Sequence, residues 1–451
     1  MHYLNLDTNS RGLPAWAETL RQHTTRQLHL PDYQENTHSV AELRAWLEAQ
    51  PETAACLAEA QRKPGESQIL YLRSSDPAWL NLPWRLAVAD LPNVQLVATP
   101  IISELPAYEE VISLPFRILV MISSPVDQEA FRKLDYETEE YRIIQALSPL
   151  VEKGLVYIEF TEDGSLEALK RKLSERPYHV LHFIGHGNYH QGVGVLELEE
   201  PNTLKQQLVS ATEMVEALRS PGINIPPLVV LSACKTAQGR EAADQAGMAF
   251  TLIREGATSV VAMNESIRDD YAILFASRLY QYIAEGETLP SAFKIATGAI
   301  RGKEFEEYQG KREPIQWLIP ELIVSQQVLR LIDPQGEKEL LVTESSIFEL
   351  TEAGVRLTRK PGTVFVGRRK ERSELLSAVA QQQPILLLGM GGVGKTALAA
   401  QLLHGLSLQN PGTNLLVFNE LTFKAHAVFE RLLALLTEDR RRFAQSQLKA
   451  A

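Results

Sequence analysis

Two reactive side chains, an imidazole and a thiol, each stand at the end of an apolar run. His186 closes the run 178–186, and Cys234 closes the run 228–234. Such runs are typical of buried parallel strands, whose carboxyl ends form the edge of an open α/β sheet where ligands bind. If the two strands are neighbours, about 5 Å apart, the two groups meet at that edge. A thiol beside an imidazole is the minimum equipment of a cysteine peptidase.

The spacing of small residues around the pair fits this chemistry. Cys234 would attack a peptide carbonyl as a thiolate, and His186 would hold the thiolate and then protonate the leaving amine. The backbone N–H groups of Gly187 and Cys234 are candidates for an oxyanion hole. Gly185 and Gly187 flank the imidazole and leave room for a substrate backbone. The alternative for Cys234 is a buried structural cysteine.

Other histidines crowd the same region but lack flanking glycines. We interpret His179, His182 and His190 as core histidines with satisfied hydrogen bonds. A zinc site would need cysteines paired at ligand spacing, and the chain has none. The sequence therefore predicts no metal site and no cofactor for the peptidase chemistry.

Composition restricts the class of protein. The chain has 451 residues, 45% of them hydrophobic and 22% charged, which is ordinary for two to four globular domains. The net charge of −11 argues against nucleic acid as a direct partner. Only two cysteines, Cys56 and Cys234, are present, so we expect a reducing, cytoplasmic environment. No apolar run reaches the roughly 20 residues of a membrane span, and no signal peptide is visible.

Strands and helices alternate through the middle of the chain. Strands are predicted at 116–122, 156–160, 178–186, 228–234 and 259–263, and helices at 136–147, 165–173, 212–218, 244–254 and 271–284. This rhythm predicts an α/β fold with a mainly parallel sheet and helices on both faces.

Four segments follow from these patterns. Residues 1–110 form an N-terminal α/β region with a helical pattern at 40–60 and strands at 68–72 and 94–98, and they are open to interpretation as a degenerate caspase-like half. Residues 111–332 are the domain that carries His186 and Cys234. Residues 333–362 lose the periodicity and are interpreted as a connector. The last segment, 363–451, begins a separate unit.

That last unit contains a complete phosphate-binding pattern. An apolar strand predicted at 384–388 leads into the pattern, and a helix is predicted at 397–403. The loop would cradle ATP or ADP, and the threonine would bind Mg²⁺. No later apolar strand ends in an aspartate that would bind the same ion, so we expect a truncated ATPase start without hydrolysis. The residues are Gly389, Gly391, Gly392, Gly394, Lys395 and Thr396.

Four ordered blocks together resemble the CHAT domain, a caspase-like and separase-like family of clan CD cysteine peptidases. They are 82–84, 182–187, 231–236 and 256–263. His186 precedes Cys234 by 48 residues, near the spacing of about 50 in caspases. The resemblance implies a caspase-like fold and a His186/Cys234 dyad with no obligatory third member. It also implies an acidic residue near the substrate pocket, for which Asp269 and Glu265 are candidates. The alternative for Asp269 is a first-turn acid of the following helix.

Residues 365–371 resemble the entry segment of STAND-type signalling ATPases, the NB-ARC and NACHT relatives. The two resemblances together imply a cysteine endopeptidase, a hydrolase acting on a protein substrate, controlled by a nucleotide switch in a prokaryotic signalling or defence pathway. An activating sensor or self-association would then be expected. The first alternative is a non-catalytic caspase-fold scaffold or oligomerisation module, which Lys235 beside the cysteine favours. The second is a chain that acts chiefly as a nucleotide-binding switch.

Overall fold

The structure is a computed structural model of the chain. By its contacts the chain divides into two units, Met1–Leu341 and Val342–Ala451, and each is described by itself. The described residues are 2–8, 17, 37–80, 82–91, 93–102, 114–128, 136–190, 193–201, 203–223, 225–234, 244–264, 267–309, 315–325, 330–333, 336, 344–351, 354–361, 368–409 and 432–433.

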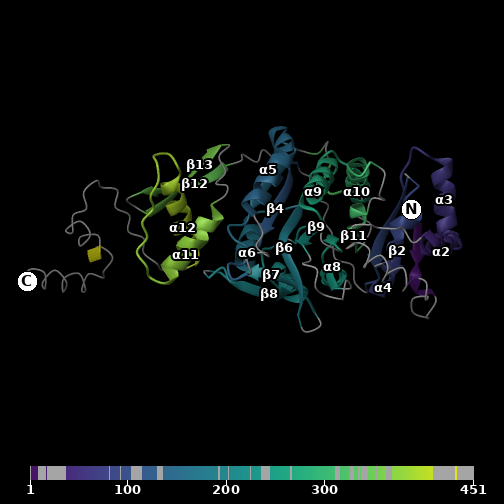
Figure 1. Ribbon diagram of the computed structural model, residues 1–451, viewed down its shortest axis with the longest axis horizontal. Coiled ribbons are helices and arrows are strands. Elements are labelled where there is room, and N and C mark those ends of the chain that lie inside the picture. Colours follow the sequence, from purple (N-terminus) through teal and green to yellow (C-terminus); the bar gives the residue numbers. More distant parts are fainter. Residues whose placement is uncertain are drawn as a thin grey trace, which may run out of the picture. The chain divides into compact units, whose positions relative to one another are not determined.

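One eleven-stranded sheet forms the centre of the larger unit (Figure 1). Its strands follow the order β1-β2-β3-β11-β10-β9-β6-β4-β5, and the hairpin of β7 and β8 continues from β6. The bounds are β1 His2–Asn5, β2 Gln68–Ser74, β3 Val94–Pro100, β4 Phe116–Ile122, β5 Val156–Phe160, β6 Val180–His190, β7 Val193–Glu199, β8 Gln206–Ser210, β9 Leu228–Cys234, β10 Ser259–Met263 and β11 Pro320–Val324.

The sheet changes direction once along its main path. Strands β10, β9, β6, β4 and β5 are parallel to one another, and β11 is antiparallel to β10. Strands β1, β2 and β3 run in the direction of β11. The starts of β3 and β11 therefore lie at the same edge of the sheet as the carboxyl ends of β9 and β6.

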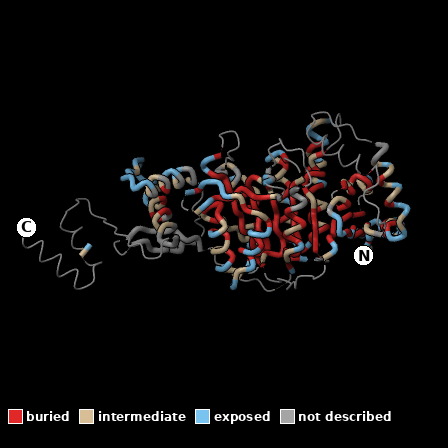
Figure 2. The backbone as a smooth tube through the Cα atoms, turned by 90° about the horizontal axis from the view of Figure 1, so that it is seen from below, coloured by how far each residue is buried: buried red, intermediate tan, exposed pale blue. Residues whose placement is uncertain are grey.

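Helices cover both faces of this sheet, and each face has its own apolar core. One core packs α2, α3, α6, α7 and α8 on the sheet, and the other packs α5, α9 and α10. Figure 2 shows buried backbone running through the middle of this unit. The bounds are α2 Thr37–Glu48, α3 Pro51–Arg62, α4 Pro77–Leu80, α5 Tyr136–Glu152, α6 Leu166–Glu175, α7 Ala211–Leu218, α8 Asp244–Arg254, α9 Asp269–Ala284, α10 Leu289–Glu307 and three short 3₁₀ turns, η1 Leu6–Thr8, η2 Trp84–Val88 and η3 Gln316–Leu318.

Local sequence explains where the elements begin and end. Every residue of β4 is buried, as expected for an inner parallel strand covered on both faces. The Ser165 side chain accepts a hydrogen bond from the Ala168 N–H and caps α6. Ser210 and Glu213 form a reciprocal capping box at the start of α7.

The predicted α/β class, with a mainly parallel sheet and helices on both faces, is confirmed. The residues assigned to a separate region at 1–110 supply β1, β2 and β3 to the same sheet. The helical pattern at 40–60 divides into α2 and α3, because the chain turns at Gln50 before Pro51 at the start of α3. In the part of the chain that the structure describes, no helix is long and apolar enough to cross a membrane.

The smaller unit is built differently from its prediction. Residues interpreted as a connector form an antiparallel hairpin of β12, Glu344–Thr351, and β13, Gly354–Pro361. Two helices follow, α11 Arg369–Ala380 and α12 Lys395–Gln409. The strand predicted at 384–388 is wrong: these residues are irregular and mostly exposed, with Leu388 81% exposed. A parallel strand needs a paired neighbour, and among the described residues none pairs with this segment.

Candidate active site

Strands β6 and β9 are neighbours in the sheet, and their pairing brings the two predicted reactive positions together. The parallel register runs from Val180 opposite Leu228 to His186 opposite Cys234. Directly opposite positions share a face of the sheet and lie about 5 Å apart. The backbone of Cys234 is described as the last residue of β9, and residues 235–243 lie outside the described residues. The backbone therefore sets His186 and Cys234 side by side at the carboxyl edge.

His186 lies in the corner where the sheet turns into the hairpin. This residue is 3% exposed. From this residue onward β6 also pairs with β7, and His186 stands opposite Glu197. The imidazole position thus has Cys234 on one neighbouring strand and Glu197 on the other.

Glu197 is a buried carboxylate that the sequence reasoning missed. It is 0% exposed. Its Oε2 accepts a hydrogen bond of 2.6 Å from Gln128 Nε2, and its Oε1 accepts one of 3.0 Å from Asn188 Nδ2. The signal in the sequence was an acid within the apolar run 195–198, but only the hairpin register places it opposite His186.

The neighbouring Glu199 has a structural task. Its Oε1 accepts the Ser124 N–H and its Oε2 accepts the Gly164 N–H, both at 2.9 Å. Ser124 follows β4, and Gly164 precedes α6. The carboxylate therefore joins two loops at the edge of the sheet that carries His186.

His182 and His179 are core histidines, as the sequence analysis predicted. Burial lowers the pKa of His182 to about 4, and its Nε2 is 2.9 Å from Ser232 Oγ. Burial lowers the pKa of His179 to about 3, and its Nδ1 accepts the Arg117 N–H at 2.8 Å. Both imidazoles are therefore neutral at physiological pH.

The core assignment of His190 is wrong, because this residue is exposed. Strand β6 does not stop at the sheet edge. It continues four residues past His186 into the hairpin and ends at His190, opposite Val193. The extra pairing carries the strand out of the core.

The glycine before the histidine has a different reason from the one predicted. A Cβ on Gly185 would lie 2.4 Å from Cζ of Phe183, so the close packing of that ring excludes a side chain. Gly185 and Phe183 are two positions apart in the strand and therefore share the face opposite to His186. Gly187 lies opposite Leu196 in the hairpin, beside the strand end that carries Cys234.

The two acidic candidates for the substrate pocket are not both described. Asp269 is the first residue of α9, and its 64% exposed side chain lies 3.6 Å from Arg142 of α5. Asp269 is thus an acidic residue in the first turn, where a negative charge stabilises the helix N-terminus electrostatically. Glu265 lies outside the described residues.

The phosphate-binding pattern has the right donors but not the predicted support. Gly392 and Gly394 have positive φ angles, and α12 begins at Lys395. Lys395 Nζ donates to the carbonyl oxygens of Gly389 and Met390, at 2.8 and 2.9 Å, so the ammonium closes onto its own loop. Because the preceding strand does not form, the described residues supply the loop and the helix of the pattern without its strand.

The family profile of the CHAT domain matches residues 57–321, which is more than half of the chain. The chain belongs to the CHAT domain family. Its match begins within α3 and ends within β11, so it spans the strands that carry His186 and Cys234. A comparison with curated proteins finds no match.

Three solved structures are among those to which this CHAT domain protein is similar. The Arg-specific cysteine proteinase gingipain R (RgpB) has 10% identity and a TM-score of 0.41, over 73% of this chain and 77% of that one. The complex of Porphyromonas gingivalis RgpB pro- and mature domains has 10% identity and a TM-score of 0.39, over 73% and 80%. The Saccharomyces cerevisiae separase–securin complex has 13% identity and a TM-score of 0.34, over 69% of this chain and 22% of that one.

Proposed function

We propose that this CHAT domain protein is a cysteine endopeptidase whose dyad is His186 and Cys234. The observation that carries the proposal is the register of β6 and β9, in which these two residues stand directly opposite each other at the strand ends. The family match covers both strands and supports the same reaction class. The substrate is a protein, because the attacked group is a peptide carbonyl.

The proposed reaction has two stages. The Cys234 thiol gives its proton to the imidazole of His186, and the thiolate attacks the carbonyl carbon. The N–H groups of Gly187 and Cys234 stabilise the oxyanion. When the C–N bond breaks, the imidazolium protonates the leaving amine. Water then gives a proton to the imidazole and hydrolyses the thioester, which releases the acid and restores the thiol.

Glu197 is proposed as the residue that positions His186. It stands opposite His186 in the hairpin, it is buried, and Gln128 and Asn188 hold its two oxygens. A fixed carboxylate beside an imidazole orients the ring and stabilises the imidazolium that forms during the reaction. We expect Glu197→Gln to lower kcat with little change in KM, and Glu197→Asp to recover part of the loss. Glu199→Gln is the comparison variant: it removes a buried carboxylate two positions away that binds the Ser124 and Gly164 N–H groups, and so reports the loss of loop contacts without the loss of a carboxylate opposite His186.

Asp269 is proposed to contribute to the pocket for the residue before the cut. Its carboxylate is exposed, and its Oδ2 lies 3.6 Å from Nη1 of Arg142. A basic substrate side chain would compete with that arginine for the carboxylate. We therefore expect a preference for lysine or arginine before the cut. Comparing cleavage of matched basic and neutral peptides by wild type and Asp269→Asn tests this assignment.

The test of the peptidase proposal is cleavage itself. Wild type and Cys234→Ala are incubated with candidate protein partners, and new protein N-termini are identified by mass spectrometry. Cleavage by wild type that is lost in Cys234→Ala and in His186→Ala supports the proposal. Cleavage that is unaffected by either substitution contradicts it, whereas no cleavage by wild type favours the non-catalytic caspase-fold scaffold.

Regulation is a separate proposal. A STAND-type switch that begins in residues 363–451 would control the peptidase in response to a sensor or to self-association, in a cytoplasmic signalling or defence pathway. The support is the phosphate-binding pattern and the helix that begins at Lys395. Titration of ATP and ADP with Mg²⁺ against wild type and Lys395→Ala tests it. Equal, weak binding of nucleotide to both proteins would contradict the proposed nucleotide switch.

A further inference from the structure

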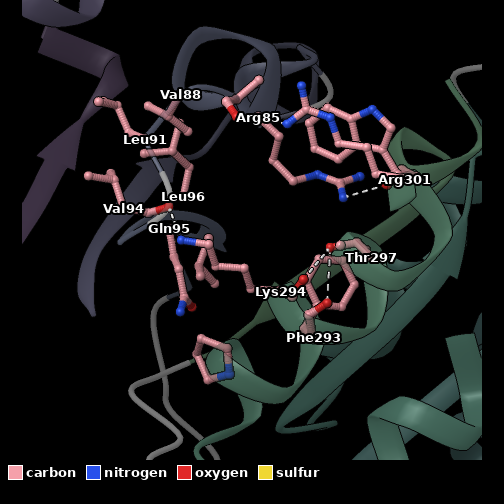
Figure 3. A pocket seen from close by; sticks show the side chains of 15 residues that line it. Arg85, Val88, Leu91, Val94, Gln95, Leu96, Phe293, Lys294, Thr297 and Arg301 are labelled. Atoms are coloured by element: carbon pink, nitrogen blue, oxygen red, sulfur yellow. Dashed lines mark hydrogen bonds between the residues drawn. The ribbon is translucent and has the colours of Figure 1, made fainter. Parts of the chain in front are cut away.

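A cavity of about 250 Å³ lies beside the same sheet edge as the dyad. The turn η2 and the start of β3 form one side, and α10 forms the other (Figure 3). Its walls combine aromatic and aliphatic side chains, among them Phe293, Trp317, Val88 and Leu96, with the cations Lys294 and Arg301. Apolar walls with a few convergent polar groups are typical of small-molecule sites.

The cations differ in how fully they are paired. Arg85 donates to the carbonyl oxygens of Trp317 and Leu318 and pairs with Glu321, so its charge is compensated by other groups of the protein. Lys294 Nζ donates to the Val94 carbonyl oxygen at 2.9 Å, a neutral acceptor. Burial lowers the pKa of Lys294 to about 8, and none of the described residues offsets this with an opposing charge. The cavity therefore contains a desolvated ammonium that favours an anion.

Arg301 adds a second positive charge over an aromatic wall. Its guanidinium carbon lies 5.1 Å from the ring centre of Trp317, and its Nη1 donates to the Ala89 carbonyl oxygen at 2.7 Å. A flat aromatic ligand would meet the same wall. The guanidinium beside it would favour a negative group on that ligand.

Gln95 supplies an acceptor in the same cavity. It is 6% exposed, and its Nε2 donates to Ser67 Oγ at 2.6 Å. Its Oε1 is buried and accepts no hydrogen bond from the described residues. A buried unpaired acceptor is costly, and an N–H group of a ligand would satisfy it.

We propose that this cavity, between η2, the start of β3 and α10, binds a small aromatic carboxylate that also carries an N–H donor. The carboxylate pairs with Lys294 and Arg301, the ring packs on Phe293 and Trp317, and the donor reaches Gln95. This site is separate from the peptidase dyad, and its test does not depend on proteolysis.

The register relates the cavity to the dyad. The aligned pairs across the sheet are Ala98 with Ile323, Pro320 with Met263, and Ala262 with Leu231. By this register Val94 lies about level with Ala233, the residue before Cys234. Three strand spacings, about 14 Å, separate β3 from β9. A ligand in the cavity therefore lies beside the catalytic edge but outside the dyad.

Gly298 offers a clean way to fill the cavity. It is an exposed residue of α10 that lines the cavity, and a Cβ there would meet nothing within 4 Å. Gly302 is one turn further along the same helix, equally open, and does not line the cavity. Gly298→Leu should occupy the ligand volume, and Gly302→Leu is its matched control.

The probe is indole-3-carboxylate, titrated calorimetrically into the full chain. We expect a dissociation constant in roughly the millimolar range or below for a ligand of this size. Lys294→Met should weaken binding about tenfold to a hundredfold, the range for loss of a charged hydrogen bond. Gly298→Leu should abolish binding, and Gly302→Leu should leave it unchanged. Indole-3-carboxamide and 1-benzothiophene-3-carboxylate, which lack the charge and the N–H respectively, should both bind more weakly.

Proton uptake gives an independent readout. At pH 8 Lys294 is about half protonated, and a bound carboxylate raises its pKa, so binding takes up a fraction of a proton. The other charged groups near the cavity are Arg85, Arg301, Glu321 and Asp90, and Lys294→Met separates any proton exchange at these groups from that at Lys294. Titrations in buffers of different ionisation enthalpy should show the uptake in wild type and not in Lys294→Met.

Two results would overturn the site. One is the absence of saturable binding by wild type at about ten times the expected constant. The other is equal affinity of wild type, Gly298→Leu and Lys294→Met, which would place the probe elsewhere on the chain.

Discussion

The contact between Arg85 and Glu321 holds the place where the sheet changes direction, and its removal should be costly. The arginine lies in η2, and its side chain is only 11% exposed; that of the glutamate, in β11, is 17% exposed. The guanidinium donates to the carbonyl oxygens of Trp317, Leu318 and Pro320 as well as to Glu321. It therefore ties the start of β11 to the segment before β3.

The size of the effect follows from what remains after Arg85→Met. The carboxylate of Glu321 stays in a desolvated place without its partner, and breaking a buried pair in this way costs about 3–5 kcal/mol in the free energy of unfolding. Burial already raises the pKa of Glu321 above its ordinary value of 4.5, and loss of the guanidinium raises it further. When a carboxyl has a higher pKa in the folded state than in the unfolded state, the free energy of unfolding falls as the pH rises from the lower of these two pKa values to the higher one. The loss in the free energy of unfolding caused by Arg85→Met should therefore be larger at pH 8 than at pH 5.

The assay is urea unfolding followed by tryptophan fluorescence. All five tryptophans lie in the larger unit, so the signal reports that unit alone. Arg44→Met is the control, because Arg44 pairs with Asp90 and Glu48 at the surface, where such pairs contribute about 0–1 kcal/mol. Arg85→Met combined with Glu321→Leu should be less destabilised than Arg85→Met alone. A loss below about 1 kcal/mol for Arg85→Met, or no difference between the two pH values, would refute the reasoning.

Three further predictions concern a glycine, a histidine and a cysteine of the core. Gly185→Ala should destabilise the protein by about 1–3 kcal/mol because the ring of Phe183 must move, whereas Gly302→Ala should be neutral or stabilising; urea midpoints decide, and equal midpoints would contradict the packing argument. Since the pKa of His182 falls from 6.5 to about 4 on folding, the unfolded state binds its proton first as the pH drops, and stability should be lost between those values; His182→Leu should show a shallower loss from pH 7 to pH 4, and an unchanged slope would contradict it. Burial raises the pKa of the Cys56 thiol to about 11, so Cys56 should resist iodoacetamide at pH 8 in the folded protein and react in urea, as peptide mass spectrometry would show.

The sequence predicted the inner strands well because their signal is local. Runs such as 116–122, 228–234 and 259–263 are continuously apolar, and the structure has strands at the same residues. The proximity of His186 and Cys234 followed from the rule that parallel strands end at a common edge, and the register confirms that the two strands are neighbours. Long-range pairing alone decides which strands lie side by side in the rest of the sheet.

What the sequence could not predict depends on that long-range pairing. Nothing in the run 320–324 shows that β11 lies antiparallel to β10 and joins β3, although this reverses the direction of four strands. Glu197 was missed because its importance comes from the hairpin register, and His190 was misplaced because the same hairpin carries β6 beyond the core. The apolar run 384–388 has the composition of a strand, but without a partner in the described chain it forms none.

The most direct test of the dyad compares the rates at which Cys234 and Cys56 react with iodoacetamide in the folded chain. The account predicts that Cys234 is modified much faster than Cys56, and that His186→Ala slows the modification of Cys234 without changing the rate at Cys56. Equal rates at the two cysteines in wild type, or a fast Cys234 that is indifferent to His186→Ala, would contradict a thiol and an imidazole acting together at this edge.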